Sequence, residues 1–362
     1  MKAAPAIEVP VSIPGATCRV LVGPGLLGRA GTLCAEAGLR GKCAVITDEN
    51  VGTLHGTTVL ASLRAAGFDP VSLTVPAGEK SKSLTAVENL IDGMLAAGLD
   101  RSSFVVALGG GVIGDLAGFA AAIYQRGIPF VQIPTTIVAQ VDSSIGGKTG
   151  VNAKAGKNLI GAFHQPCLVL ADTDTLATLP DREYREGFAE VIKHAAIRDA
   201  EMLDEIDPAA PRSSLAPLIA RNIAIKAAIV AEDEKENSDK RALLNFGHTI
   251  GHAIENVAGY GELLHGEAIS LGLAAALLIS ERNGRLSAAE AGRVRAKLSA
   301  FGLPLTLPAH LDTDALLAAA AKDKKFSAGQ IRFVIVPRLG EAVVSEDVTE
   351  SDLRSAIETI RA

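Results

Sequence analysis

The sequence predicts an α/β protein in which an N-terminal domain, residues 1–178, contains a mostly parallel β-sheet and a C-terminal domain, residues 179–362, is mainly α-helical. In the first half, short apolar runs alternate with helical patterns, which is typical of parallel strands covered by helices on both faces. A glycine-rich turn joins one of these runs to a helix. From about Asp181 onward, long segments rich in Ala and Leu replace the alternation.

The same patterns predict the individual elements. Apolar runs of strand length, rich in β-branched residues, predict strands, and longer segments with helical periodicity predict helices. The expected strands of the first half are residues 19–22, 43–47, 71–75, 104–108, 130–133 and 168–170, with a late strand at 331–336. The expected helices between them are residues 54–66, 84–97 and 115–124.

Length and composition indicate a globular chain. With 362 residues, of which 48% are apolar, the chain can bury a substantial core. No apolar run reaches the ~18 residues that cross a bilayer, and residues 1–10 contain no apolar segment typical of a secretory signal. We therefore expect a cytoplasmic protein without a membrane partner.

Cysteines and charges exclude two further classes. Cys18, Cys34, Cys43 and Cys167 have no metal-binding spacing and predict small core residues rather than disulfides. A net charge of -6, with scattered cations and no Trp, provides no surface for nucleic acid. An anionic small molecule would have to be bound by local cations.

The segment Gly109-Gly-Gly-Val-Ile-Gly114 follows an expected strand and precedes an expected helix. It matches GxGxxG, the Rossmann-like turn whose backbone N–H groups and helix N-terminus bind a pyrophosphate. The ribose-binding acid usually found about 20 residues later is missing. Asp48, Glu79 and Lys82 are the candidate substitutes, and a plain tight turn with packing glycines is the alternative.

A second segment, Asp142-Ser-Ser-Ile-Gly-Gly-Lys148-Thr, combines hydroxyls and small residues in what we expect to be one loop, extended by Lys154, Lys157 and Asn158. These groups suit phosphate or polyol oxygens. The segment does not match the P-loop pattern. A solvated, lysine-rich loop is the alternative interpretation.

The segment 241–253 predicts one helix with a polar stripe. Arg241, Asn245, His248 and His252 stand at i, i+4, i+7 and i+11, which places them on one face. A cation, an amide and two imidazoles are costly to bury without partners. Their natural counterparts are a metal ion and an anionic ligand, so this helix is expected to line an active site.

Glu186, Glu190 and Lys193 share a face of another expected helix, residues 185–194. One carboxylate with two imidazoles is a recurring set of metal ligands. Three sets remain open: His248 with His252, Glu190 with His194, or Glu190 with His248 and His265. A histidine in the core or on the surface is the alternative for His194 and His265.

Several further cations stand near these segments and could bind a phosphate monoester, because its dianion favours converging donors. They are Arg126, Lys226 on an expected helix at residues 222–229, and Lys322, Lys324 and Lys325.

With these residues assembled, the chain resembles the 3-dehydroquinate synthases and, more widely, the sugar phosphate cyclases of the dehydroquinate synthase and iron-dependent alcohol dehydrogenase superfamily. The resemblance extends from about Asp48 to Val336. It rests on motifs in the family's order: Gly109-Gly-Gly-Val-Ile-Gly-Asp, Pro134-Thr-Thr, Asp142-Ser-Ser-Ile-Gly-Gly-Lys-Thr, Glu190-Val-Ile-Lys, Arg241-Ala-Leu-Leu-Asn-Phe-Gly-His and His265-Gly-Glu.

The resemblance implies a role for each matching residue, with the active site in a cleft between the two domains. It selects Glu190, His248 and His265 as ligands of zinc, or of cobalt in some members. It implies that NAD is bound by Asp48, Asn50, Glu79, Lys82, Gly110, Gly111, Val112, Ile113, Gly114, Asp115, Thr135, Thr136, Lys148, Lys157, Thr175, Leu176 and Thr178. It places around the substrate Asp142, Lys148, Asn158, Lys193, Lys226, Arg241, Asn245 and His252, with one lysine of 322–325. Arg126 resembles an arginine that reaches across a homodimer.

The implied reaction converts 3-deoxy-D-arabino-heptulosonate 7-phosphate to 3-dehydroquinate and phosphate, the second step of the shikimate pathway. It proceeds by transient oxidation with NAD, phosphate elimination, re-reduction and intramolecular aldol closure. Three alternatives remain: a sister cyclase that makes an inosose or valiolone, a metal- and NAD-dependent polyol dehydrogenase, and a non-catalytic binding protein stabilised by metal.

Overall fold

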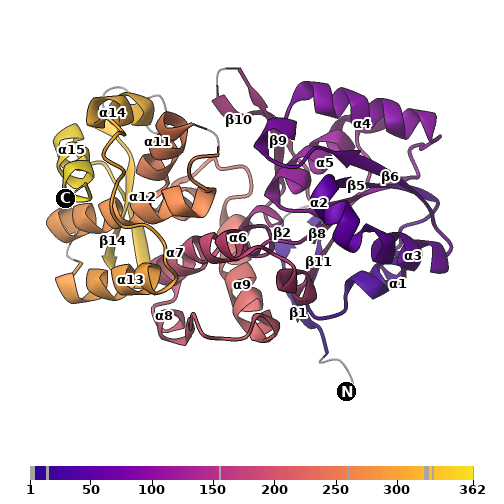
Figure 1. Ribbon diagram of the computed structural model, residues 1–362, viewed down its shortest axis with the longest axis horizontal. Coiled ribbons are helices and arrows are strands. Elements are labelled where there is room, and N and C mark those ends of the chain that lie inside the picture. Colours follow the sequence, from indigo (N-terminus) through magenta and orange to yellow (C-terminus); the bar gives the residue numbers. More distant parts are fainter. Residues whose placement is uncertain are drawn as a thin grey trace. The chain divides into compact units, whose positions relative to one another are not determined.

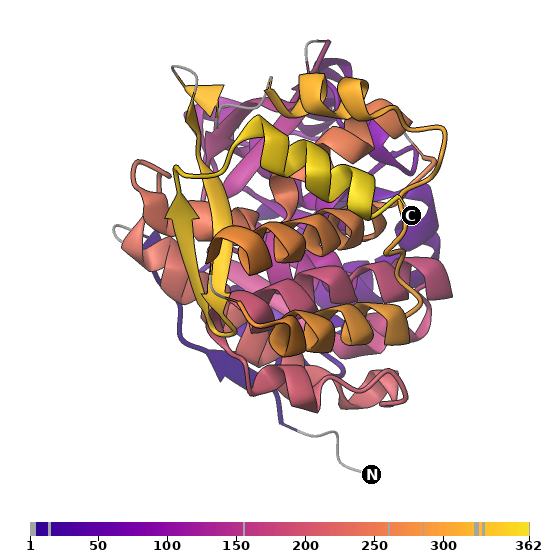
Figure 2. The ribbon, with the colours of Figure 1, turned by 90° about the vertical axis from the view of Figure 1, so that its left-hand side faces the viewer.

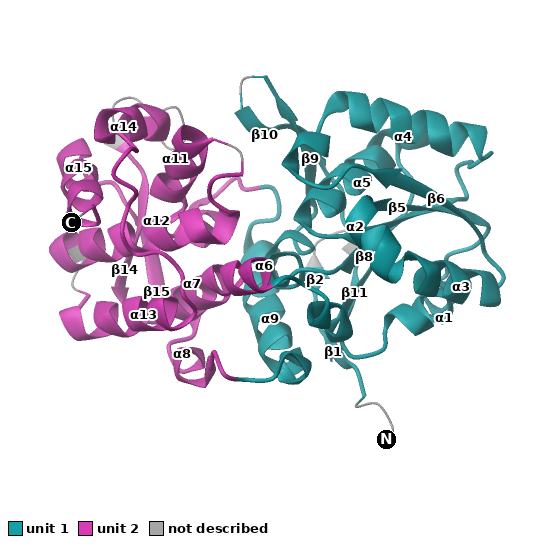
Figure 3. Cartoon of the chain, viewed as in Figure 1, with its two compact units in different colours: residues 1–180, 210–235 teal, residues 181–209, 236–362 magenta. Residues whose placement is uncertain are grey.

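The computed structural model describes residues 5–13, 16–154, 156–259, 261–284, 286–321, 326–327 and 330–361. It divides the chain into two compact units, which Figure 3 distinguishes by colour. Unit 1 comprises residues 1–180 and 210–235, and unit 2 comprises residues 181–209 and 236–362. The placement of one unit relative to the other is not determined, so the expected cleft between domains stays a prediction.

Unit 1 is built on a seven-stranded sheet with the order β1-β4-β11-β8-β7-β5-β6. The strands from β4 to β6 in this order are parallel, and β1 pairs antiparallel with β4 at the edge. The bounds are β1 Ile7–Val9, β4 Arg19–Gly23, β5 Lys42–Asp48, β6 Asp69–Val75, β7 Phe104–Gly109, β8 Phe130–Pro134 and β11 Leu168–Asp172. Each strand expected in the first half is confirmed to within about two residues.

Helices cover both faces of this sheet (Figure 1). Alternate residues of β5 point into different cores: Ala44 and Ile46 pack with α4 and α5, and Cys43 and Val45 pack with α1 and α3. A strand buried on both faces must be apolar at every position, which explains the continuous apolar runs of the sequence. The bounds are α1 Ala30–Glu36, α3 Thr57–Ala65, α4 Leu84–Ala96 and α5 Gly111–Ile123.

The strand order reverses between β5 and β7. The chain passes from β5 to β6 on one side and continues from β7 to β8 and β11 on the other. In open parallel sheets, ligands bind at the carboxyl edge beside such a switch point. Asp48 ends β5 and Gly109 ends β7, and these two strands are hydrogen-bonded neighbours. The candidate cofactor residues therefore lie where the topology favours a ligand.

Two helices begin earlier than expected. The expected helix at 54–66 is preceded by α2 (Glu49–Val51) and the π-helical turn η2 (Gly52–Gly56), because the Asp48 carboxylate caps the first turn. Helix α5 begins at Gly111 rather than at residue 115. The sequence did not predict this start, because the first turn is rich in glycine, which has a low helix propensity.

The prediction that residues 142–158 form one loop is wrong in part. The segment begins in the π-helical turn η5 (Ala139–Ser143), but from Lys148 onward it belongs to a two-stranded hairpin of β9 (Lys148–Ala153) and β10 (Gly156–Phe163). Gly150 and Gly161 pair across the hairpin, where a Cβ on Gly161 would lie 3.1 Å from the Cα of Gly150. Glycine is required at these two positions because the strands approach each other closely. Since glycine is unfavourable in strands, the sequence did not predict β9 and β10.

The division into units also differs from the expected domains. It falls after Pro180 instead of residue 178, and residues 210–235 belong to unit 1. These residues contain α9 (Ala216–Glu232), which packs on η5, β1 and β4. A helix that follows three helices of unit 2 in sequence thus returns to unit 1, which periodicity cannot reveal.

Unit 2 is mainly helical, as expected, and packs around α12 (His265–Ile279). This helix is buried along nearly its whole length and contacts α7, α11, α15 and β14. In Figure 2, helices of this unit face the viewer beside the hairpin of β14 (Phe333–Arg338) and β15 (Glu341–Ser345). The other bounds are α6 Asp181–Glu186, α7 Phe188–Arg198, α8 Met202–Glu205, α10 Asp239–Ala242, α11 His248–Ala258, α13 Ala288–Ala300, α14 Thr313–Ala321, α15 Glu350–Thr359, β12 Phe326–Ser327 and β13 Gln330–Ile331, with β2 Ser12–Ile13 and β3 Ala16–Thr17 in unit 1.

Within the described part of the chain, no helix is both long enough and apolar enough to cross a membrane.

We predict that Gly272→Ala lowers the free energy of unfolding by about 1–3 kcal/mol, because a Cβ on α12 would overlap the carbonyl oxygen of Gly247 and lie 2.7 Å from the nitrogen of Gly251. The matched control is Gly292→Ala on α13, where a Cβ meets nothing within 4 Å. That change should be neutral or stabilise by up to ~1 kcal/mol. Urea unfolding of both variants measures the difference, and equal midpoints would contradict the close packing of α11 on α12.

Candidate metal centre and cofactor site

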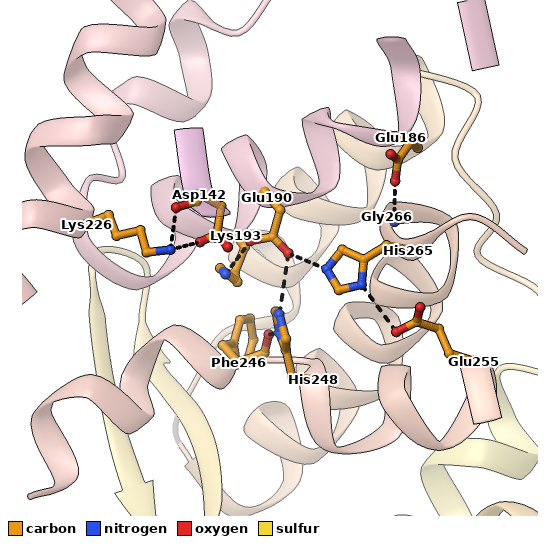
Figure 4. Close-up of polar contacts among 10 residues, drawn as sticks. All are labelled: Asp142, Glu186, Glu190, Lys193, Lys226, Phe246, His248, Glu255, His265 and Gly266. Atoms are coloured by element: carbon orange, nitrogen blue, oxygen red, sulfur yellow. Dashed lines mark hydrogen bonds and ion pairs between the residues drawn. The ribbon is translucent and has the colours of Figure 1, made fainter. Parts of the chain in front are cut away.

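Three side chains of unit 2 converge from three helices (Figure 4). Glu190 lies on α7, while His248 and His265 are the first residues of α11 and α12. The Nε2 atoms of both histidines lie 3.4 Å from Oε1 of Glu190. One ligand atom from each residue lies within 4.8 Å of the others, a spacing at which one ion can contact all three.

The continuous helix expected over residues 241–253 is wrong, because the helix is interrupted before His248. This interruption sets the direction of the His248 side chain. Helix α10 is followed by the 3-10 turn η8 (Leu243–Asn245), and α11 begins only at His248. Between them, Gly247 has φ +78°, in the left-handed region that favours glycine, with the Leu273 side chain 2.8 Å from a Cβ there. Arg241 and Asn245 therefore precede the break, and only His248 and His252 share a helix.

The second ring nitrogen of each histidine has a partner that fixes the ring. His248 Nδ1 lies 3.1 Å from the carbonyl oxygen of Phe246, and His265 Nδ1 lies 3.2 Å from Oε2 of Glu255. A hydrogen on Nδ1 leaves the lone pair on Nε2, which faces Glu190. The sequence reasoning missed Glu255, although it stands at i+7 from His248 on the same helix face.

Charge around the centre keeps Glu190 ionised. Burial raises the pKa of Glu190, but Lys193 and His248 outweigh burial and hold it well below its usual range. Burial and the Lys193 charge lower the pKa of His248. Burial alone would lower the pKa of His265. Its hydrogen bonds to Glu190 and Glu255 outweigh burial and raise the pKa well above its usual value. The Glu190 carboxylate therefore stays ionised although it is fully buried.

These donors fit a divalent metal of the zinc type. Glu190 is fully buried, and within the described residues the groups that face its two carboxylate oxygens are the Lys193 ammonium and the two imidazoles. One carboxylate oxygen and two imidazole nitrogens leave a coordination position open for a hydroxyl group. Of the three ligand sets that spacing allowed, the structure brings together Glu190, His248 and His265, and it also places a ring nitrogen of His194 within 4.8 Å of a Glu190 oxygen. The ring of His252 stands 5.1 Å from that of His248.

Carboxylates also fix the first turn of α12, which carries His265. Glu186 Oε2 accepts a hydrogen bond from the Gly266 nitrogen at 2.5 Å, and burial raises the pKa of Glu186 to about 7. Glu267 Oε2 accepts from the Leu264 nitrogen at 2.8 Å, and Arg182 donates to both oxygens of Glu267 at 2.7 Å. The sequence did not indicate this positioning role for Arg182 or Glu186.

The other candidates of unit 2 differ in their burial. Lys193 is 1% exposed, stands one turn after Glu190 on α7 and pairs with its carboxylate. Arg241 is 3% exposed on α10. Asn245 is half-buried in η8, and His252 is exposed on α11. A buried cation in a polar site favours an anionic ligand.

In unit 1, the glycine turn lies at the carboxyl end of β7 as expected. Gly110 is the N-cap of α5, and no side chain caps that helix. Its first N–H groups therefore suit an anion such as pyrophosphate. A Cβ on Gly110 would lie 3.2 Å from the Thr136 side chain, and a Cβ on Gly111 would lie 3.0 Å from the Ser143 side chain. The buried Thr135 hydroxyl has no hydrogen-bond partner within the described residues, which also fits a bound cofactor.

A carboxylate stands beside this turn on the neighbouring strand. Asp48 Oδ1 accepts hydrogen bonds from the nitrogens of Asn50 and Val51 at 2.9 and 3.0 Å. Asn50 is exposed on α2. Asp48, one of the candidates expected to replace the missing ribose-binding acid, therefore lies on the strand beside the turn, and its contact with NAD stays a prediction.

An ion pair links the next cofactor candidates to α5. Lys82 Nζ lies 2.5 Å from Oδ2 of Asp115, in the second turn of that helix. Burial raises the pKa of Asp115, and the Lys82 charge opposes the rise. Glu79 accepts a hydrogen bond from Asn152 Nδ2 at 2.8 Å. Of the remaining residues of the turn, Val112 is half-buried, and Ile113 and Gly114 are buried.

The expected substrate residues of unit 1 form a second group. Lys226 Nζ on α9 lies 2.6 Å from the carbonyl oxygen of Asp142 and 2.9 Å from its Oδ1. Lys148, Lys157 and Asn158 lie on the β9–β10 hairpin, where Lys148 and Asn158 are exposed and Lys157 is half-buried. The structure thus brings Lys226 to Asp142, which sequence separation could not predict.

Other candidates lie farther from the turn. Thr175 and Leu176 are buried in the 3-10 helix η6 (Thr173–Ala177), and the Thr175 hydroxyl donates to the Asp172 carbonyl at 2.7 Å. The Thr178 hydroxyl lies 3.0 Å from His55 Nε2. Arg126 is exposed in the 3-10 turn η4 (Tyr124–Arg126), which follows the far end of α5 at the amino edge of the sheet. Residues 322–325 lie outside the described residues.

Solved structures share this fold over nearly the whole chain. A 2-epi-5-epi-valiolone synthase from Streptomyces hygroscopicus subsp. jinggangensis, with NAD+ and Zn2+ bound, has a TM-score of 0.86 at 31% identity, covering 96% of this chain and 98% of its own. A 2-deoxy-scyllo-inosose synthase with carbaglucose-6-phosphate, NAD+ and Co2+ has a TM-score of 0.87 at 25% identity, covering 99% of each chain. A glycerol dehydrogenase from Schizosaccharomyces pombe, at 15% identity and a TM-score of 0.65, shares the fold alone.

Curated relatives are more similar in sequence. The 3-dehydroquinate synthase of Caulobacter vibrioides is 47% identical over 96% of this chain and 97% of the relative. That of a Synechococcus strain is 43% identical over 98% and 99%. The family models for the N-terminal and C-terminal parts of 3-dehydroquinate synthase match residues 72–186 and 187–326. With a metal-type centre and an uncapped glycine turn in one chain, these matches show that it belongs to the 3-dehydroquinate synthase family.

Proposed function

We propose that the chain converts 3-deoxy-D-arabino-heptulosonate 7-phosphate to 3-dehydroquinate and phosphate. The observation that carries the proposal is the convergence of Glu190, His248 and His265 in a chain that also has an uncapped glycine turn. A metal site and a dinucleotide turn together suit reversible oxidation of an alcohol. The NAD+ with Zn2+ or Co2+ in the solved cyclases supports the same cofactors here.

Sequence similarity favours this reaction over that of a sister cyclase. The curated relatives named 3-dehydroquinate synthase are 43% to 47% identical, whereas the solved valiolone and inosose synthases are 31% and 25% identical. The buried cations Lys193, Lys226 and Arg241 also favour a phosphorylated substrate over a simple polyol, because charged donors bind a phosphate dianion more strongly than a neutral hydroxyl group.

When bound, the metal lowers the pKa of a hydroxyl group that it contacts, and NAD accepts and later returns a hydride. The chain holds both groups in place. Glu190, His248 and His265 bind the metal, and Glu255 and the Phe246 carbonyl fix the imidazole rings. NAD is held by the glycine turn from Gly110 to Asp115 and by Asp48, Asn50, Glu79, Lys82, Thr135, Thr136, Lys148, Lys157, Thr175, Leu176 and Thr178.

Cations orient the phosphate group in the proposed complex. Lys193, Lys226 and Arg241 are buried, so an incoming dianion meets donors that water does not screen. Asp142 holds the Lys226 ammonium. His252, on the same helix as His248, assists proton transfer. Lys148, Asn158 and Asn245 complete the substrate contacts.

The proposal includes a homodimer in which Arg126 serves the partner's site. Arg126 is exposed and has φ +72°, and the preceding Gln125 has φ +50°. Two successive non-glycine residues in the left-handed region are costly and need a compensating interaction. The cytoplasmic location expected from the sequence stays a prediction.

We predict that the purified chain with metal and catalytic NAD releases one phosphate per heptulosonate phosphate consumed, without accumulation of NADH. Phosphate is followed by a coupled assay and NADH by its absorbance, with and without a chelator. Because the metal contributes directly to the oxidation, chelation should abolish release. Stoichiometric NADH from a simple polyol would favour the dehydrogenase instead, and turnover of a different sugar phosphate would favour a sister cyclase.

We predict that Glu255→Gln weakens metal binding about 10–100-fold, because the carboxylate that orients His265 loses its charge. Competition with a chelator measures the Zn2+ dissociation constant, and the Co2+ absorption spectrum reports the ligand geometry. Glu262→Gln is the matched control, since Glu262 is exposed in the same unit and pairs with His310 at 2.8 Å. Metal binding of Glu255→Gln at the wild-type level would contradict this role.

We predict that Arg126→Ala and Glu190→Gln are each inactive alone and that mixing them restores roughly a quarter of the wild-type activity. Random exchange puts half of the chains in mixed dimers, each with one site that has both residues intact. The mixture is assayed after subunit exchange, and sedimentation measures the oligomeric state. A monomeric chain, or a mixture that remains inactive, would show that Arg126 does not act across a dimer.

A further inference from the structure

Asn152 on β9 joins two segments of unit 1 that carry different candidate ligands. Its Nδ2 donates to Glu79 Oε1 at 2.8 Å, and its Oδ1 accepts the backbone N–H of Asn158 at 2.9 Å. Its backbone nitrogen also donates to the carbonyl oxygen of Lys82 at 2.9 Å. Two of these hydrogen bonds connect the Glu79 to Lys82 segment with β9, and the third connects β9 with β10 at Asn158.

The orientation of the Asn152 amide follows from its partners. A backbone N–H can only donate, so the atom facing Asn158 must be the oxygen. An ionised carboxylate can only accept, so the atom facing Glu79 must be the nitrogen. No flipped amide satisfies both partners, and neither an Asp nor a Leu at this position can make both contacts.

Asn158 depends on such support because its backbone is strained. Its φ of +56° lies in the left-handed region, which asparagine tolerates better than most residues but still at a cost. The pairing of β9 with β10 shifts register between Gly156 and Ile160, so ladder hydrogen bonds are irregular around Asn158. The bond to Asn152 compensates for this local irregularity.

We infer that Asn152 couples the binding of NAD at Glu79 to the conformation of the hairpin that presents Asn158 to the substrate. This inference rests on the proposed function, which assigns Glu79 to the cofactor and Asn158 to the substrate. A ligand that fixes Glu79 also fixes its amide partner, and through it the Asn158 backbone. Such coupling is reciprocal, so a hairpin held in place strengthens NAD binding by the same factor.

The test compares Asn152→Asp with the wild-type holoenzyme. The new carboxylate repels Glu79 instead of donating to it, which also displaces it from Asn158, so we expect faster amide exchange at Asn158 in the NAD-free variant. We expect the NAD dissociation constant to rise about tenfold. We also expect NAD to slow amide hydrogen exchange in residues 148–163 of the wild type but not of the variant. Asn89→Asp, the same change at an exposed position of α4, should behave as the wild type.

The double variant Asn152→Asp with Glu79→Gln rebuilds the bridge with donor and acceptor exchanged. It should restore slow exchange at Asn158 in the NAD-free protein, independently of any cofactor contact that Glu79 makes. Exchange that remains fast would overturn the bridge, and so would Asn152→Asp with wild-type NAD affinity and a wild-type response of the hairpin. If the wild type itself binds no NAD, the proposed function fails and this inference fails with it.

Discussion

The burial of the Glu190 charge is the constraint on which unit 2 depends. A carboxylate without solvent exposure is stable only with compensating partners, and here two imidazoles and the Lys193 ammonium surround it. These partners come from α7, α11 and α12, so the three helices must end or begin at defined positions. The left-handed Gly247 and the carboxylates around the first turn of α12 meet that requirement.

Helix starts carry most of the chemistry in both units. His248 and His265 open α11 and α12, and the glycine turn opens α5. The first turn of α5 has no side-chain cap, so an anion can approach its backbone N–H groups closely, whereas Glu186 and Glu267 cap the first turn of α12. The rest of α5 and of α12 is mostly buried and apolar, which holds the opening residue in place, whereas α11 also carries the exposed His252.

Much of this arrangement could be predicted from the sequence. Continuous apolar runs located the parallel strands, and the GxGxxG spacing after β7 located the cofactor turn. Spacing alone could not choose among three metal sets, because Glu190 and His265 come from other helices than His248. It also placed Arg241 and His252 on one helix, which Gly247 divides, and it concealed β9 and β10, whose paired glycines mimic a loop. Tertiary contacts fix the positions of Glu255, Asn152 and α9. Such contacts produce no periodic pattern in the sequence, so these positions could not be predicted from it.

The separation of the metal ligands along the chain affects the order of assembly. Glu190, His248 and His265 become neighbours only when α7, α11 and α12 have packed, and each long loop between them costs closure entropy. An unfolded chain therefore offers an ion no more than single, weak contacts. We therefore expect the metal to bind after the helices of unit 2 have packed. The ion then stabilises the folded helices and does not nucleate folding.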